Sequence, residues 1–208
     1  MNKNNSFRNV IRLGFTSFLN DASSEMILPI LPLIITGMGG GGLALGLIGG
    51  LRESAAELLK APIGHWSDKI KQRKVFIYAG YLTSALFKLF LLLATSWQQV
   101  FVLIGLERFG KALRTAPRDA LITSSAPDMI GKGFGIHRAF DNLGAIVGSI
   151  LVFYLLWQWR LSFNVIIGIA ALIGFVSIIP LRKVTESPIA QEPITPELSL
   201  SVFSKPFA

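Results

Sequence analysis

Charged side chains recur at helical spacing inside stretches of this sequence that are otherwise strongly apolar. Glu107 and Lys111 are four residues apart, and Arg114 lies on the same face of the stretch if it is helical. Taken along the whole chain, the residues of this kind are Asp21, Glu25, Glu53, Glu57, Glu107, Arg108, Lys111, Arg114, His137 and Asp141. Carboxylates inside a membrane helix can relay protons, and neighbouring bases can balance them or hold an anion.

The composition indicates which kind of protein carries these residues. Hydrophobic residues make up 51% of the 208 residues, charged residues only 15%, and the mean hydropathy is +0.56. A soluble domain has about 25% charged residues, so most of this chain is expected to face lipid. The formal charge is +8, and the absence of cysteine excludes a disulfide framework and a thiolate metal site.

The hydropathy pattern predicts six membrane-spanning helices, each of which needs about 20 mostly apolar residues. The segments that qualify are 10–36, 43–66, 75–95, 100–122, 134–157 and 161–181. Pro29 and Pro32 are expected to weaken the first helix near its end. The sequence therefore predicts an all-α membrane protein, with a six-helix bundle over residues 1–183 and a cytoplasmic, Pro-containing tail or linker over residues 184–208.

Lysine and arginine are distributed unequally between the two sides of these spans. They gather in the N-terminal segment, in the loop 67–74, in the region 114–138 and in the tail, whereas the opposite loops hold only Arg160. Cytoplasmic loops of membrane proteins carry an excess of these residues, so both termini are predicted to be cytoplasmic. This topology also explains the basic balance without a nucleic-acid partner.

The charges inside the spans need partners, because one charge at a helix centre costs about 2.5–3.5 kcal/mol on insertion scales. Such faces must contact protein or a wet cavity. We expect Glu107 and Lys111 to pair along their helix, and Arg108 to reach Asp21 or Glu53 on another helix. An ion-pair network that only fixes helix packing is the alternative to a polar pathway through the bilayer.

Two further residues allow more than one interpretation. His137 and Asp141 are four residues apart, which suits a proton relay or a metal ligand but also a hydrogen-bonded packing pair. Lys88 lies in the third span, where we expect it to snorkel toward the interface or to pack.

The loop GHWSDKIKQRK, residues 64–74, resembles the signature between the second and third helices of the major facilitator superfamily. The residues that match this signature are Gly64, Asp68, Lys69, Arg73 and Lys74. The resemblance implies that they form a cytoplasmic gate motif. Lys71 occupies the position of the usual turn glycine, so we expect the turn to be made differently. Arg108 resembles the fourth-helix arginine that the family associates with proton coupling.

Two further similarities support this assignment. GAIVGS, residues 144–149, is similar to a weakened form of the fifth-helix motif, in which Gly144 and Gly148 would pack against another helix. FLNDASSEMILP and ERFGKALRTAPRDALI, residues 18–29 and 107–122, look like a bacterial subgroup of permeases. The resemblance implies the bacterial inner membrane. It also implies a central cavity lined by the first, second, fourth and fifth spans, with the third and sixth more peripheral.

Members of this family normally have twelve helices in two halves, whereas this sequence holds six spans and no repeat that would supply six more. It is expected to be an N-terminal half. The expected function is a half-sized secondary transporter that moves a small solute by alternating access, coupled to protons, as a homodimer or with a second half. The alternatives are a truncated subunit that scaffolds a larger complex, and a divalent-metal exporter that uses Asp21, Glu25 and Asn20 as oxygen ligands.

An enzyme is not expected, because the sequence has no nucleophile–base set, phosphate-binding loop or metal-ligand spacing. No cofactor, metal site or nucleic-acid partner is predicted. The expected partners are membrane lipid, the small molecule or ion that is moved, and the second half.

Overall fold

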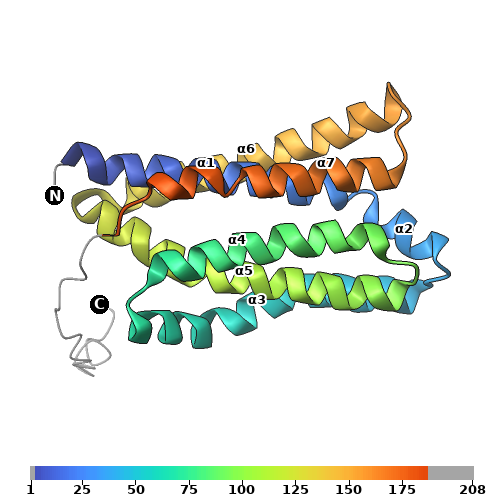
Figure 1. The fold of residues 1–208 in the computed structure, drawn as a ribbon, viewed down its shortest axis with the longest axis horizontal. Coiled ribbons are helices and arrows are strands. Elements are labelled where there is room, and N and C mark those ends of the chain that lie inside the picture. Colours follow the sequence, from blue (N-terminus) through green and yellow to red (C-terminus); the bar gives the residue numbers. More distant parts are fainter. Residues whose placement is uncertain (1–2, 187–208) are drawn as a thin grey trace, which may run out of the picture.

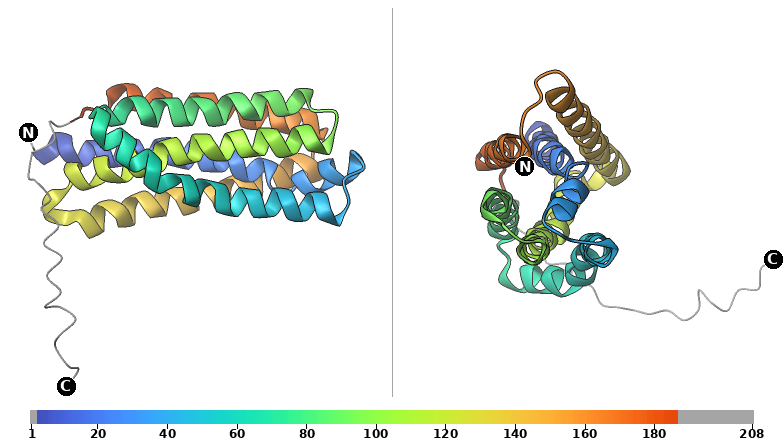
Figure 2. Two further views of the ribbon diagram at one scale, coloured as in Figure 1. Left: turned by 90° about the horizontal axis from the view of Figure 1, so that it is seen from below. Right: turned by 90° about the vertical axis from the view of Figure 1, so that its right-hand side faces the viewer.

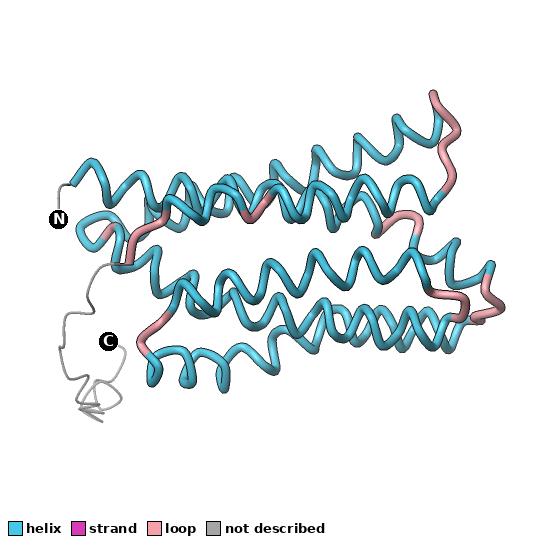
Figure 3. Tube along the Cα trace, in the orientation of Figure 1, coloured by secondary structure: helices cyan, strands magenta, loops and turns pink. Residues whose placement is uncertain are grey.

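The computed structural model describes residues 3–186, and this part of the chain is helical throughout. The α-helices are α1 (Lys3–Ile27), α2 (Leu31–Gly37), α3 (Gly42–Ile70), α4 (Arg73–Phe90), α5 (Trp97–Ser125), α6 (Ile130–Trp157) and α7 (Phe163–Val176). Short 3-10 turns follow α4 (η1, Leu91–Leu93), precede α6 (η2, Pro127–Met129) and follow α7 (η3, Ile179–Lys183). Figure 3 shows that most of the loops lie at the two ends of the bundle. A two-residue turn at 177–178 separates α7 from η3.

The helices match the six expected spans, with the first divided between α1 and α2. The chain turns at Leu28–Ile30. Pro29 disfavours the helical conformation of the residue before it, Leu28, so the helix ends there. Pro32 lies in the first turn of α2, where the missing N–H of a proline does no harm. The predicted weakening of the first helix is therefore a complete break.

Four of the spans are long and apolar enough to cross a membrane by length and composition alone. They are 7–37, 73–93, 127–157 and 163–183. Helices α3 and α5 have 29 residues each, which suffices for about 44 Å at 1.5 Å per residue, but both carry several charges. They run alongside the other four through the whole bundle (Figure 1). The two helices that hydropathy does not mark thus include α5, which carries most of the charged candidate residues.

The bundle consists of two layers of three helices, which Figure 1 shows one above the other. One layer contains α1, α6 and α7, and the other contains α3, α4 and α5. Helix α1 packs against α6 and α7, α5 packs between α3 and α4, and α4 meets α7 across the layers. The end-on view in Figure 2 shows these contacts as an open ring of helices. The first residues of α1 and the end of η3 lie at the same end of the bundle (Figure 1).

Two clusters of buried apolar side chains hold the layers together, one toward each end of the bundle. The cluster near the chain ends includes Leu13, Ile77 and Leu121, and the cluster near the opposite end includes Met26 and Ile104. Along α1, α4 and α5 the polar residues of the candidate site lie between these two clusters. Apolar packing therefore closes both sides of a polar middle zone.

Small residues let the helices approach closely at two contacts. A Cβ placed on Gly144 or Gly148 of α6 would overlap the carbonyl oxygen of Phe18 or Ala22 on α1. Such close backbone approach is typical of helix pairs in membranes. In the second contact, a Cβ on Gly110 of α5 would lie 2.9 Å from the carbonyl oxygen of Gly80 on α4.

The chain remains ordered against the bundle just beyond the expected boundary at residue 183. Val184 is buried, and Asn9 Nδ2 donates a hydrogen bond to the Thr185 carbonyl oxygen at 2.8 Å. Glu186 accepts a hydrogen bond from the backbone N–H of Lys74. The rest of the expected tail, residues 187–208, lies outside the described part of the chain.

Gly148→Ala should destabilise the bundle, because the added Cβ forces α1 and α6 apart, and overpacking of this kind costs about 1–3 kcal/mol. Thermal unfolding of the purified protein in detergent measures the effect. Gly49→Ala on α3 is the matched control, because a Cβ there meets nothing within 4 Å. The control should unfold at or above the original temperature, since alanine favours a helix more than glycine does. Equal unfolding temperatures for the two variants would contradict the close contact.

Candidate functional site

A polar cavity of about 70 Å³ opens in the middle of the bundle between α1, α3, α5 and α6. Its lining residues are Asp21, Ser24, Glu25, Arg52, Glu107, Arg108, Lys111, Arg114 and Ala145. These helices correspond to the first, second, fourth and fifth spans, which are the ones that the resemblance places around a central cavity. Helix α5 contributes most of the charge.

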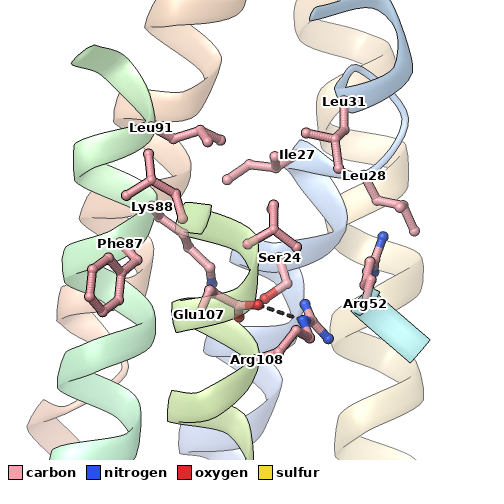
Figure 4. Close-up of a pocket in the computed structure, with 12 residues that line it drawn as sticks. Ser24, Ile27, Leu28, Leu31, Arg52, Phe87, Lys88, Leu91, Glu107 and Arg108 are labelled. Carbon is pink, nitrogen blue, oxygen red and sulfur yellow. Dashed lines mark ion pairs between the residues drawn. The ribbon is translucent and has the colours of Figure 1, made fainter. Parts of the chain in front are cut away.

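A second cavity of about 30 Å³ adjoins the first on the side of α4. The two share Ser24, Arg52, Glu107 and Arg108, and the second adds Lys88 among apolar side chains. Figure 4 shows Lys88 extending from α4 toward Glu107 on α5. A cavity needs about 10–15 Å³ to hold one water molecule, so both spaces are large enough to be wet.

The central ion pair joins two neighbouring residues of α5. Arg108 Nε lies 2.6 Å from Glu107 Oε2, and the side chains are only 8% and 5% exposed (Figure 4). The expected pairing of Glu107 with Lys111 along the helix is therefore wrong. Lys111 is half-buried at the edge of the polar cavity, where its ammonium group keeps access to water.

The expectation that Arg108 reaches an acid on another helix is also wrong. Glu53 lies on the exposed face of α3 and does not line either cavity, and Asp21 lines the polar cavity without an ion pair to Arg108. The guanidinium of Arg108 instead contacts the buried carboxylate of the adjacent residue on its own helix.

The contact between Glu107 and Arg108 leaves hydrogen-bonding capacity unused. Neither carboxylate oxygen of Glu107, nor Arg108 Nε, makes a hydrogen bond of good geometry to another group in the described part of the chain. Buried polar atoms normally have partners, and each exception calls for an explanation. Here the atoms border two cavities, so water or a ligand can satisfy them.

One ion pair crosses between the layers at the same depth. Arg52 Nη2 on α3 lies 3.1 Å from Glu25 Oε1 on α1 and donates a hydrogen bond to it. The sequence analysis did not single out Arg52 as a site residue. The sequence could have indicated its role, because Arg52 is a charged residue inside the second apolar span and lies near two acids.

Lys88 is the second residue that the sequence analysis did not place among the site residues. Of the two expected outcomes, snorkelling and packing, the structure shows packing, because the residue is only 4% exposed. Nζ donates a hydrogen bond to Ser23 Oγ at 2.9 Å and lies 3.4 Å from the Asn20 carbonyl oxygen, both on α1. The third span therefore contributes a cation to the middle zone, although the resemblance places this span at the periphery.

The remaining candidates divide into a second polar group and an exposed pair. Closer to the chain ends, Arg118 Nη2 lies 3.0 Å from Asp119 Oδ1, and Lys60 Nζ lies 3.8 Å from Asp119 Oδ2. His137 Nδ1 lies 3.3 Å from Asp141 Oδ2, and His137 is buried. Glu53 and Glu57 are exposed on the outer face of α3, so the structure does not bring them into the site.

The loop motif forms a compact turn between α3 and α4. Arg73 Nη2 donates a hydrogen bond to Asp68 Oδ1 at 2.9 Å, and Lys74 Nζ donates one to the Val184 carbonyl oxygen at 2.6 Å. Lys69 is exposed, and a Cβ on Gly64 would lie 3.1 Å from Ala116 Cβ on α5. Gly64 therefore allows α3 and α5 to lie close together.

The turn itself uses the backbone geometry of a glycine. Lys71 follows α3 with φ 58°, and its N–H donates to the Ser67 carbonyl oxygen at 3.0 Å. The expectation of a differently made turn is wrong, because the left-handed conformation is kept and lysine adopts it. This conformation costs a residue with a Cβ about 1–2 kcal/mol.

A metal site receives no support from this arrangement. The described part of the chain brings together no group of three or more histidine or carboxylate side chains that could hold an ion. Glu25, one of the proposed oxygen ligands, is already occupied by Arg52. The described residues therefore offer no ligand set for the divalent-metal variant of the expected function.

Comparison with known proteins accounts for this architecture. The sequence model of the Major Facilitator Superfamily (MFS) matches residues 13–207. The chain belongs to this superfamily. It is thus an integral membrane protein of a family of transporters, not of enzymes.

Several members and one solved structure resemble the chain. An uncharacterized MFS-type transporter of Methanocaldococcus jannaschii is 56% identical over 87% of this chain and 46% of its own length. The multidrug resistance protein MdtG of Escherichia coli is 28% identical over 68% of the chain and 36% of its own length. A crystal structure of the peptide transporter POT, in complex with sulfate, covers 83% of the chain with a TM-score of 0.66 and 21% identity. This chain spans less than half the length of each of these proteins.

Arg108→Met should destabilise the protein strongly, because Glu107 would keep a buried charge without its partner. Removing one member of a buried pair typically costs about 3–5 kcal/mol. The double variant with Glu107→Gln should recover much of the loss, since no charge is stranded. The yield of monodisperse protein and its unfolding temperature measure both effects.

Arg138→Met is the matched control for this pair, because the Arg138 side chain is 74% exposed and its ion pair with Asp141 is long, at 4.0 Å. It should change the unfolding temperature little. If Arg108→Met were no more harmful than the control, the pair at 2.6 Å would not be a stabilising contact.

Proposed function

We propose that this chain acts as one half of a secondary transporter, which moves a small solute by alternating access and couples this movement to protons. The observation that carries the proposal is the polar cavity at the middle of the bundle, bordered by a buried carboxylate with no hydrogen-bond partner in the described part of the chain. Transporters of this kind bind substrate and coupling ion near the bilayer midplane.

The chemistry of the cavity supports the proposed coupling to protons. Glu107 borders both cavities and contacts Arg108, so the two spaces meet at a group that can exist with or without a proton. Ionisable residues inside membrane helices are costly, and where they are kept they commonly mark ion paths or proton relays. His137 and Asp141 are proposed to extend this path toward the chain ends, since their contact at 3.3 Å lies in the neighbouring polar group.

A second half is part of the proposal because charge remains exposed at membrane depth. Glu53 and Glu57 lie near the middle of α3 on a face that no described residue covers. The same face carries Gly46 and Gly50, where an added Cβ would meet nothing within 4 Å. A second six-helix half, from another copy or from another chain segment, would shield these carboxylates from lipid.

We further propose that the end holding the loop between α3 and α4 faces the cytoplasm. That end carries the basic residues Lys69, Lys71, Arg73 and Lys74. Basic residues in short loops favour the cytoplasmic side. The gate motif would then close the cytoplasmic mouth of the cavity in one of the two alternating states.

Single-cysteine variants test the orientation and the wet cavity together, because the sequence contains no cysteine. A membrane-impermeant thiol reagent added to intact cells should label Gly41→Cys, at an exposed position where an added Cβ meets nothing within 4 Å, and should leave Gln72→Cys unlabelled. In permeabilised membranes it should also label Ala145→Cys, which lines the polar cavity. The readout is the mass shift of the purified protein.

Ile150→Cys on the same helix is the control, because Ile150 is 62% exposed on a surface of the bundle and lines neither cavity. It should stay unlabelled if that surface faces lipid. Labelling of Gln72→Cys from outside would overturn the orientation. Protection of Ala145→Cys in permeabilised membranes would remove the observation on which the transporter proposal rests.

Cross-linking tests the second half. Leu58→Cys on α3 should form a disulfide-linked dimer in membranes if two copies cover the carboxylate-bearing face, since Leu58 is 75% exposed beside Glu57. Leu172→Cys on α7, which is 64% exposed, should remain monomeric. Electrophoresis without reductant distinguishes the two. Equal dimer formation by both variants would mean random collision, and none by Leu58→Cys would exclude a second copy on this face.

A further inference from the structure

The charges around the two central cavities do not balance. The cavity linings contain five cations, Arg52, Lys88, Arg108, Lys111 and Arg114. They contain three carboxylates, Asp21, Glu25 and Glu107. The middle zone of the bundle therefore holds a formal excess of two positive charges, at a depth where an unpaired charge is expensive.

The polar group nearer the chain ends has no such excess. There Lys60 and Arg118 contact Asp119, and Asp141 contacts His137. Arg138 also lies 4.0 Å from Asp141, but its side chain is 74% exposed. Apart from this exposed arginine, two cations accompany two carboxylates and a histidine. The imbalance belongs to the cavities and is not a general property of the polar helices.

Two of the five cations have only neutral partners. Lys88 donates to a serine hydroxyl and lies near a backbone carbonyl oxygen. Arg114 donates to Ser84 Oγ at 2.5 Å and lies over the ring of Tyr81, with 4.5 Å between the guanidinium carbon and the ring centroid. Neutral groups can solvate a cation, but they do not cancel its charge.

Lys111 is the cation left free to contact a ligand. It lines the polar cavity and is half-buried, and its ammonium group makes no hydrogen bond or ion pair with a described residue. Arg52 and Arg108 are engaged with Glu25 and Glu107. An ammonium group has three donors, so Lys111 can offer all of them to an oxygen-rich group in the cavity.

We propose that the polar cavity binds an anionic solute, either a small divalent oxyanion or the oxyanion group of a larger molecule, with Lys111 as its contact residue. This inference rests on the proposed transport function, because it names the class of solute that the cavity would carry. A dianion would cancel the excess charge, and charge-assisted hydrogen bonds are about twice as strong as neutral ones.

Binding of inorganic phosphate and of succinate to the purified chain tests this inference. The chain is placed in nanodiscs of phosphatidylcholine, whose headgroups carry no net charge and so do not compete. Isothermal titration calorimetry should detect saturable binding of at least one anion and none of tetramethylammonium. Lys111→Gln should weaken binding about 10- to 100-fold, the range expected when one charged hydrogen bond is lost.

Two further variants separate a binding role from a structural one. Asp21→Asn removes a negative charge from the same cavity and should strengthen anion binding, which a merely unstable protein would not do. This variant also keeps the test decisive if Lys111→Gln fails to fold. Lys132→Gln is the matched control, because Lys132 is exposed at the start of α6 and lines neither cavity.

Saturable binding of tetramethylammonium but not of either anion would overturn the inference. The same holds if neither anion binds, or if anion binding is equal in Lys111→Gln and Lys132→Gln. Failure of the proposed transport function would give a different result. Anion binding without flux in proteoliposomes would contradict transport but would leave the anion-binding site standing. Flux of a cationic solute would leave the transporter proposal standing and refute this one.

Discussion

Glu107 and Arg108 are neighbours on a helix that crosses a hydrocarbon layer, and most of the structure can be understood from the cost of placing them there. Neither charge is tolerable alone, because lipid offers nothing to hydrate it. Helix α5 is therefore surrounded, with α3 and α4 packed on two sides and α1 across the cavity. The apolar clusters above and below keep this polar zone in the middle of the bundle.

The layers are held by two different kinds of contact. Within each layer, close approach at glycines such as Gly110 and Gly148 gives shape-specific packing that does not depend on charge. Between the layers, polar side chains of α1 meet those of α3 and α4, as in the contacts Glu25–Arg52 and Ser23–Lys88. The tightest packing thus lies within the layers, and the polar contacts lie where the cavities open.

Much of the fold can be predicted from the sequence because lipid imposes simple rules. The lengths of the apolar stretches locate the spans, Pro29 locates the break in the first one, and the charged faces identify α5 as the helix around which the site is built. Partner choice cannot be predicted in this way. Spacing places Lys111 on the same face as Glu107, but the structure pairs Glu107 with Arg108, because a long side chain can fold back along its own helix.

Lys88 and Lys71 show two further limits of the sequence. Whether a lysine in an apolar stretch snorkels or is buried depends on which neighbour faces it, and only the assembled bundle places Ser23 of α1 beside Lys88. At Lys71 the pattern of the family would have a glycine, yet the turn keeps its left-handed backbone. The ion pair of Arg73 with Asp68 spans this turn and supports its geometry, although lysine is a poor residue for it.

The location of the central ion pair within a single helix also affects how the bundle can move. A salt bridge between two helices acts as a latch that must be broken before they slide past each other. Glu107 and Arg108 instead travel together as a neutral unit, so a swivel of α5 against α1 carries their charges along without separating them. Among the described residues, the latch at this depth is the contact of Arg52 on α3 with Glu25 on α1, which must break before these two helices can move apart.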